Sequence, residues 1–136
     1  MLRREKEITK KPNANILVID DDPAIHRVFS RILQKAGYNV ETAETGKEAL
    51  EKIKIHAYDV ALIDVKLPDI NGLELLPILK KAAPSMIKIV ITGYSLSEER
   101  MDALNLGADE FLKKPIKPEY LIKIIKEKLD AKANSQ

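Results

Sequence analysis

The stretch ILVIDDDP, residues 16–23, joins an apolar run directly to three adjacent carboxylates and a proline. A continuous apolar run such as its first four residues is typical of a strand buried on both faces of a parallel sheet. Asp22 fits the N-cap of a helix that begins at Pro23, since proline is favoured at the first helical position. Asp20 and Asp21 are then two further like charges at the end of a buried strand. They need an explanation other than capping.

Strands and helices are expected to alternate along the rest of the chain. The expected strands are Ile16–Ile19, Asn39–Thr42, Val60–Val65, Ile87–Thr92 and Glu110–Lys113. The expected helices begin at Pro23, at the capping boxes Thr45–Glu48 and Ser95–Glu98, near Leu73, and at Pro118. Pro77 lies inside the third helix, where it removes a backbone hydrogen bond or kinks the helix. The alternation predicts an α/β fold, a flavodoxin-like doubly wound (βα)5 sandwich whose parallel five-stranded sheet has the order 2-1-3-4-5.

Composition narrows the class of protein. The chain has 136 residues, is 45% hydrophobic and contains no cysteine, which fits one domain without disulfides or a thiolate metal site. Its charge is +3 in residues 1–12, −5 in 13–112 and +4 in 113–136. We expect a flexible basic arm at 1–13, one folded domain at 14–131 and a tail at 132–136. No apolar run approaches the ~20 residues of a membrane span, so a cytoplasmic protein is expected.

Polar residues lie at the carboxyl ends of four of the expected strands. Sheets of this kind bind ligands outside the carboxyl ends of their strands, at the switch point between strands 1 and 3. The residues at those ends are Asp20, Asp21, Asp64, Thr92 and Lys114. Carboxylates gathered at one rim repel each other, so they require a cation. Oxygen ligands without cysteine or a nearby histidine favour Mg²⁺.

Each of these residues also has an ordinary interpretation. A run of aspartates is most often a solvated turn with a helix cap, and a lone Asp64 is usually hydrogen-bonded to loop amides. Thr92 alone is a common strand residue, and Lys114 is one lysine among many. His26 and His56 are interpreted as surface side chains without a role. The joint placement of the other residues on one rim is what favours a functional site.

Four segments resemble the receiver domain of two-component response regulators. They are ILVIDDDP (16–23), LIDVKLPDINGLELL (62–76), IVITGYS (89–95) and FLKKPI (111–116). This resemblance to the CheY-like superfamily covers about residues 14–131. It implies a signalling switch that accepts a phosphoryl group from a sensor histidine kinase or a histidine phosphotransfer protein and then acts on a downstream effector. Such a receiver catalyses its own phosphorylation and slow autodephosphorylation and is not otherwise an enzyme.

The resemblance also implies roles for individual residues at the rim. Asp64 is the phosphoacceptor. Asp20 and Asp21 form the acidic pair that holds Mg²⁺, for which Mn²⁺ can substitute, and Asp21 is the more direct ligand. Asp64 and the backbone carbonyl of Lys66 are the remaining protein ligands. Lys114 neutralises one phosphoryl oxygen.

Further roles concern switching and the lifetime of the phosphoryl group. Thr92 binds a phosphoryl oxygen and moves with Phe111, the aromatic switch residue, and the Lys114–Pro115 peptide bond is cis. Lys66 and Tyr94 flank the path of the attacking water, and bulky Tyr94 is expected to slow dephosphorylation. The surface that changes is that of the fourth helix, the fifth strand and the fifth helix, about residues 96–129. A phosphorylation-dependent homodimer is expected through the same surface.

Three other functions remain as alternatives. Asp20 and Asp22 at a first strand end are similar to the nucleophile and general acid of haloacid-dehalogenase-like phosphatases, but Ala24 stands where that family usually has Thr or Val. A degenerate receiver acting as an unphosphorylated scaffold is disfavoured by the intact Asp64 and its neighbours. Binding of nucleic acid through the basic ends lacks a reading helix and interleaved aromatic residues. We therefore expect no direct nucleic-acid binding and no membrane contact by this domain.

Overall fold

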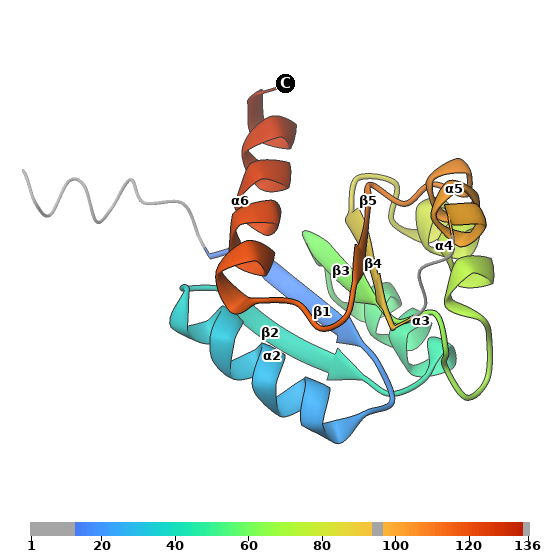
Figure 1. Cartoon of the computed structure of the whole chain (residues 1–136), viewed down its shortest axis with the longest axis horizontal. Coiled ribbons are helices and arrows are strands. Elements are labelled where there is room, and N and C mark those ends of the chain that lie inside the picture. Colours follow the sequence, from blue (N-terminus) through green and yellow to red (C-terminus); the bar gives the residue numbers. More distant parts are fainter. Residues whose placement is uncertain (1–12, 94–96, 135–136) are drawn as a thin grey trace, which may run out of the picture.

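The computed structural model describes residues 13–93 and 97–134, and within them five strands alternate with five helices (Figure 1). The expected arm at 1–13, apart from Asn13, and the last two residues of the expected tail at 132–136 lie outside the described residues. Tyr94 and the start of the capping box at Ser95 also lie outside them.

The strands form one parallel sheet in the order β2-β1-β3-β4-β5, which confirms the predicted fold. The strands are β1 (Asn15–Ile19), β2 (Asn39–Ala43), β3 (Val60–Ile63), β4 (Ile87–Thr92) and β5 (Glu110–Lys113). The helices are α2 (Pro23–Lys35), α3 (Gly46–Ile55), α4 (Gly72–Ala82), α5 (Ser97–Asn105) and α6 (Pro118–Asn134). The last helix therefore continues past residue 131, where the domain was expected to end.

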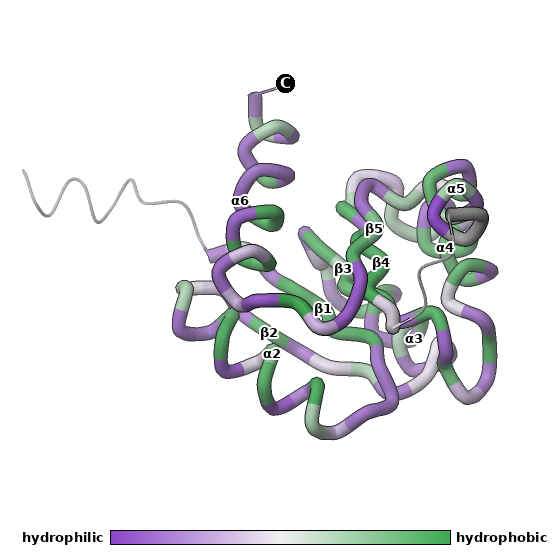
Figure 2. Tube along the Cα trace, viewed as in Figure 1, coloured by the Kyte–Doolittle hydropathy of each residue, from purple (hydrophilic) through white to green (hydrophobic). Residues whose placement is uncertain are grey.

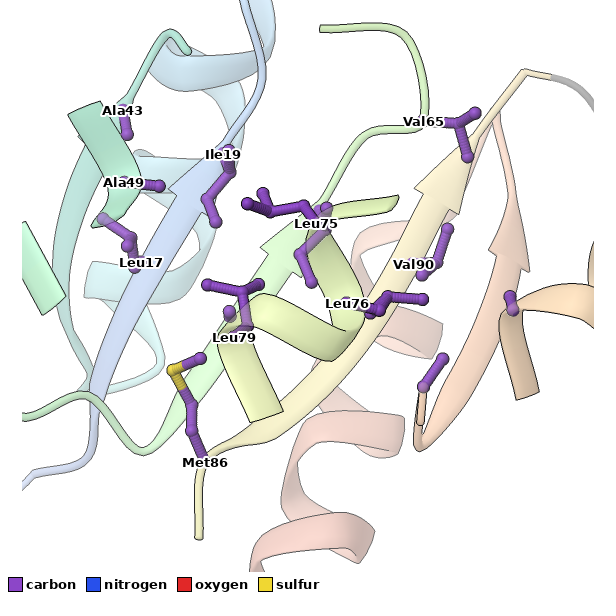
Figure 3. Close-up of a cluster of buried hydrophobic side chains, with 14 of the residues drawn as sticks. Leu17, Ile19, Ala43, Ala49, Val65, Leu75, Leu76, Leu79, Met86 and Val90 are labelled. Atoms are coloured by element: carbon purple, nitrogen blue, oxygen red, sulfur yellow. The ribbon is translucent and has the colours of Figure 1, made fainter. Parts of the chain in front are cut away.

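Helices cover both faces of the sheet and bury two apolar clusters. On one face, α2 and α6 pack over the strands through Phe29, Leu33, Leu121 and Ile125. On the other face, Leu75, Leu76 and Leu79 of α4 point toward β1 and β4 (Figure 3). The strands in the middle of the sheet are mostly apolar, whereas the helices alternate polar and apolar residues (Figure 2). This is the pattern expected of a parallel sheet that is buried on both sides.

The helix starts follow the local chemistry of the sequence. The Asp22 side chain accepts a hydrogen bond from the Ala24 amide at 2.9 Å, so its predicted capping role is confirmed. The Thr45 hydroxyl accepts one from the Glu48 amide at 2.9 Å and caps α3 in the same way. These caps satisfy amides that have no partner within their helices.

The third strand ends two residues earlier than expected, at Ile63 rather than Val65. The Asp64 amide still donates to the Ile19 carbonyl at 2.9 Å, but the Val65 carbonyl accepts from the Gly72 amide at 2.7 Å. The chain therefore turns back on itself at once. A Cβ at Gly72 would lie 2.1 Å from the Asp64 carbonyl oxygen, so only glycine fits this close approach.

Pro77 provides a test of the helix energetics. It lies in the exposed middle of α4, where it cannot donate to the Leu73 carbonyl four residues earlier. We expect Pro77→Ala to raise the free energy of unfolding by about 1–3 kcal/mol, because alanine restores that bond and is a better helix former. Urea denaturation measures the change. Leu79→Ala, at a fully buried position of the same helix, is the control and loses about 2–5 kcal/mol. A Pro77→Ala protein no more stable than the parent would contradict this account.

Candidate functional site

Three carboxylates meet at the carboxyl ends of β1 and β3. Asp20, Asp21 and Asp64 each offer an oxygen, and these oxygens all lie within 4.8 Å of one another. Asp20 is 3% and Asp64 9% exposed, whereas Asp21 is open to solvent. The backbone fixes both buried residues, because the Asp20 amide bonds to the Ala43 carbonyl and the Asp64 amide to the Ile19 carbonyl. The predicted convergence of these residues at the switch point is therefore present.

Lys114 brings a positive charge to the same rim. Its Nζ donates to Asp20 Oδ2 at 2.8 Å and lies 3.5 Å from Asp64 Oδ1, so one lysine links the ends of β1 and β3. The Lys114 amide donates to the Thr92 carbonyl at 2.8 Å, which places buried Thr92 beside it at the end of β4. The Lys114–Pro115 peptide bond is cis, as the resemblance implied.

The three adjacent carboxylates of the DDD run have three different surroundings. Asp20 Oδ1 accepts from the Asp22 amide at 2.9 Å while Oδ2 faces Lys114. Asp22 points away and caps α2, and Asp21 projects from the turn. His26, expected to be a surface residue without a role, is half-buried, and its Nε2 contacts the Asp20 carbonyl oxygen. In the sequence, the one indication of this contact is that His26 stands four residues after the N-cap Asp22, in the first turns of the helix.

The electrostatics of the rim are unbalanced toward negative charge. Burial raises the pKa of Asp64, the charge of Asp20 raises it further, and Lys114 partly opposes both effects. Burial alone would lower the pKa of Lys114, but its hydrogen bonds and charge interactions with Asp20 and Asp64 raise the pKa overall. Among the described residues, three carboxylates thus gather at the rim, and Lys114 pairs with two of them, Asp20 and Asp64. A donor set made only of oxygen and short of positive charge fits a hard divalent ion such as Mg²⁺.

The remaining predicted residues lie around this centre. Phe111 is buried in the apolar cluster beneath α4 and α5, and its carbonyl accepts a hydrogen bond from Arg100 at 3.5 Å. Lys66 is exposed and forms an isolated antiparallel bridge with Asn71. Tyr94 lies outside the described residues. The structure thus brings Asp20, Asp21, Asp64 and Lys114 together directly and places Thr92 next to Lys114.

Doubly wound α/β domains bind their ligands at the switch point of the sheet, and in this chain that point carries Asp20, Asp21, Asp64 and Lys114. Residues 16–126 match the family described as the response regulator receiver domain. The chain belongs to this family.

Relatives among characterised proteins agree with this assignment. The chain is 33% identical over 115 residues to the alginate biosynthesis transcriptional regulatory protein AlgB of Pseudomonas aeruginosa, covering 85% of this chain and 26% of that protein. It is 37% identical over 107 residues to the response regulator MprA of Mycolicibacterium vanbaalenii, covering 79% and 46%. The chain therefore spans between a quarter and a half of the length of these relatives.

Solved structures share the fold closely. A CheY-like receiver domain protein from Methanospirillum hungatei superposes with a TM-score of 0.88 at 44% identity, covering 91% of this chain and 99% of that chain. The beryllofluoride-activated NtrC4 receiver domain dimer gives a TM-score of 0.83 at 36% identity, covering 87% and 98%. Among the described residues, no helix combines the length and apolar character needed to cross a membrane.

The raised pKa of Asp64 leads to a prediction about stability. A carboxyl group whose pKa is higher in the folded state costs stability as pH rises through the unfolded and then the folded pKa. We expect Asp64→Asn, without metal, to raise the free energy of unfolding at about pH 7 by about 1 kcal/mol, because the cost of burying the charged carboxylate and its repulsion from Asp20 are removed. The gain should disappear near pH 3, where the carboxyl group is already neutral.

Urea denaturation in the presence of a chelator, at both pH values, measures this effect. Asp22→Asn is the matched control, since it removes a charge two residues from Asp20 at an exposed cap that asparagine also fills well. A stability gain for Asp64→Asn of the same size at both pH values would contradict the electrostatic explanation.

Proposed function

We propose that the chain is a phosphoacceptor switch that takes a phosphoryl group onto Asp64 from a phosphohistidine of a sensor kinase or phosphotransfer protein. One observation carries the proposal. Asp64 lies with Asp20 and Asp21 in one carboxylate cluster, and Lys114 Nζ is 3.5 Å from its Oδ1. This is the set of charges that a carboxylate nucleophile needs if it is to hold a phosphoryl group.

In the proposed reaction, an oxygen of Asp64 attacks phosphorus, a P–O bond forms, and the bond from phosphorus to the donor histidine nitrogen breaks. The product is an acyl phosphate. Lys114, already 3.5 Å from Asp64, neutralises one phosphoryl oxygen, and the Thr92 hydroxyl binds another. Asp64 and Lys114 are held at the strand ends before the donor arrives, so these two residues need little reorganisation during transfer.

The side chains of Asp20, Asp21 and Asp64 would hold Mg²⁺ or Mn²⁺, with Asp21 as the more direct ligand and the Lys66 carbonyl as a further one. When bound, the metal neutralises charge on the phosphoryl oxygens. Lys66 and Tyr94 would then tune the rate at which water attacks the acyl phosphate. Slow autodephosphorylation returns the domain to its resting state.

Phosphorylation adds charge at Asp64 and would shift the face formed by α5, β5 and α6. Thr92 moves toward the phosphoryl group and Phe111 follows into the vacated space. The face carries exposed apolar side chains at Met101, Leu104 and Tyr120, which suit contact with an effector or with a second copy of the chain.

Effector proteins or domains are the proposed downstream partners. Any contact with nucleic acid would be made by these effectors and not by this domain. The relatives include transcriptional regulatory proteins that are longer than this chain. Regulators of that kind act in the cytoplasm, where we expect this domain to work.

Mass spectrometry after incubation with acetyl phosphate and Mg²⁺ tests the reaction. We expect one added phosphoryl group, none after chelation of the metal, and none in Asp64→Asn. Asp22→Asn should be phosphorylated like the parent. Phosphorylation of the Asp64→Asn protein would contradict the proposal. Loss of the phospho-aspartate only in Asp20→Asn would favour the phosphatase-like alternative.

Amide NMR spectra with and without beryllofluoride test the switch. We expect shifts at the rim and also along α5, β5 and α6, because Thr92 and Phe111 connect the two regions. In Thr92→Ala the shifts at the rim should remain while those on α5 and α6 become smaller. Changes confined to the rim in the parent protein would rule out the proposed switch, and Asp64→Asn controls for nonspecific effects.

A further inference from the structure

The segment between β3 and α4, residues 64–71, carries both the proposed phosphoacceptor and the proposed carbonyl ligand of Lys66; we call it the β3–α4 loop. Its base is closed by two contacts. The Gly72 amide donates to the Val65 carbonyl at 2.7 Å, and Lys66 pairs with Asn71 in an antiparallel bridge. Asn71 also caps α4 by accepting from the Leu73 amide at 2.8 Å.

The tip of this loop is attached to a different element. Asp69 Oδ1 accepts from the Gly46 amide and Oδ2 from the Lys47 amide, both at 2.9 Å. These are the first two residues of α3, more than twenty positions away in the sequence. The two hydrogen bonds lower the pKa of the exposed Asp69 carboxyl group, so it remains ionised and able to accept both.

The loop tip and the start of α3 pack closely at Gly46. A Cβ at Gly46 would lie 2.4 Å from Ile70 Cγ2 and 3.5 Å from Asp69 Oδ1, so the absence of a side chain lets the loop tip reach the helix. Thr45 caps α3 through the Glu48 amide and leaves the two preceding amides to Asp69. The start of α3 therefore offers the loop two fixed donors and the positive end of the helix dipole.

We propose that Asp69 is a positioning residue for the metal site: by attaching the loop tip to the start of α3, it holds the Lys66 carbonyl in place for Mg²⁺. The inference rests on the proposed function, in which Mg²⁺ binds at this rim. Lys66 belongs to the closed base, three residues before Asp69 at the attached tip. Without the Asp69 contact, the loop becomes ordered only when the metal binds. The conformational entropy that the loop then loses weakens metal binding.

Calorimetric titration of the unphosphorylated protein with MgCl₂ tests the proposal. We expect Asp69→Ala to raise the Mg²⁺ dissociation constant about tenfold. This is the lower end of the effects seen for residues that orient metal ligands. Asp69→Asn keeps one acceptor oxygen and should fall between the parent and Asp69→Ala. Hydrogen exchange at the Gly46 and Lys47 amides should speed up in the same order.

Asp109→Ala is the matched control. Asp109 Oδ2 also accepts a backbone amide, that of Lys88 at 2.7 Å, but at the other end of β4. Its loss should lower thermal stability without changing Mg²⁺ affinity. Parental affinity in Asp69→Ala, or equal weakening in Asp109→Ala, would overturn the role of Asp69 and leave the proposed function standing. A parent protein that binds no Mg²⁺ would overturn both.

Discussion

The contact of Lys114 with Asp20 and Asp64 is the interaction on which the rim depends. Two buried carboxylates on neighbouring strands repel each other, and a low-dielectric setting strengthens that repulsion. Lys114 reaches both from the segment after β5 and offsets part of their charge. Because it offsets only part, the folded domain keeps a deficit of positive charge at one place. That deficit is what makes the rim suitable for a divalent cation and then for an anionic group.

The surrounding fold tolerates this cost because stability comes from elsewhere. Two apolar clusters lie on the two faces of the sheet, and the strands that carry the rim residues are buried almost without interruption. Asp20, Asp21, Asp64 and Lys114 follow a strand within one or two positions, and Thr92 is the last residue of β4. The apolar core therefore determines where the polar groups of the rim lie.

Much of the fold and of the candidate site could be predicted from local sequence patterns. The apolar runs indicated the strands, the capping residues Asp22 and Thr45 indicated helix starts, and the handedness of parallel crossovers left few sheet orders. The convergence of Asp20, Asp64 and Lys114 followed from that order. What could not be predicted depends on contacts distant in sequence. The early end of β3 needs the Gly72 amide, and the Asp69 contact joins a loop to a helix that no short motif connects to it.

The close approach at Gly72 limits which substitutions this position tolerates. This residue bears no charge and has no proposed part in the reaction, yet the Asp64 backbone occupies the space where any side chain would begin. Random mutation should therefore be purged at codon 72 as severely as at the codons for the reacting groups. Among variants that still function, position 72 should therefore be as invariant as the reacting residues. The reason is that the turn at Asp64 leaves no volume for even a methyl group at Gly72.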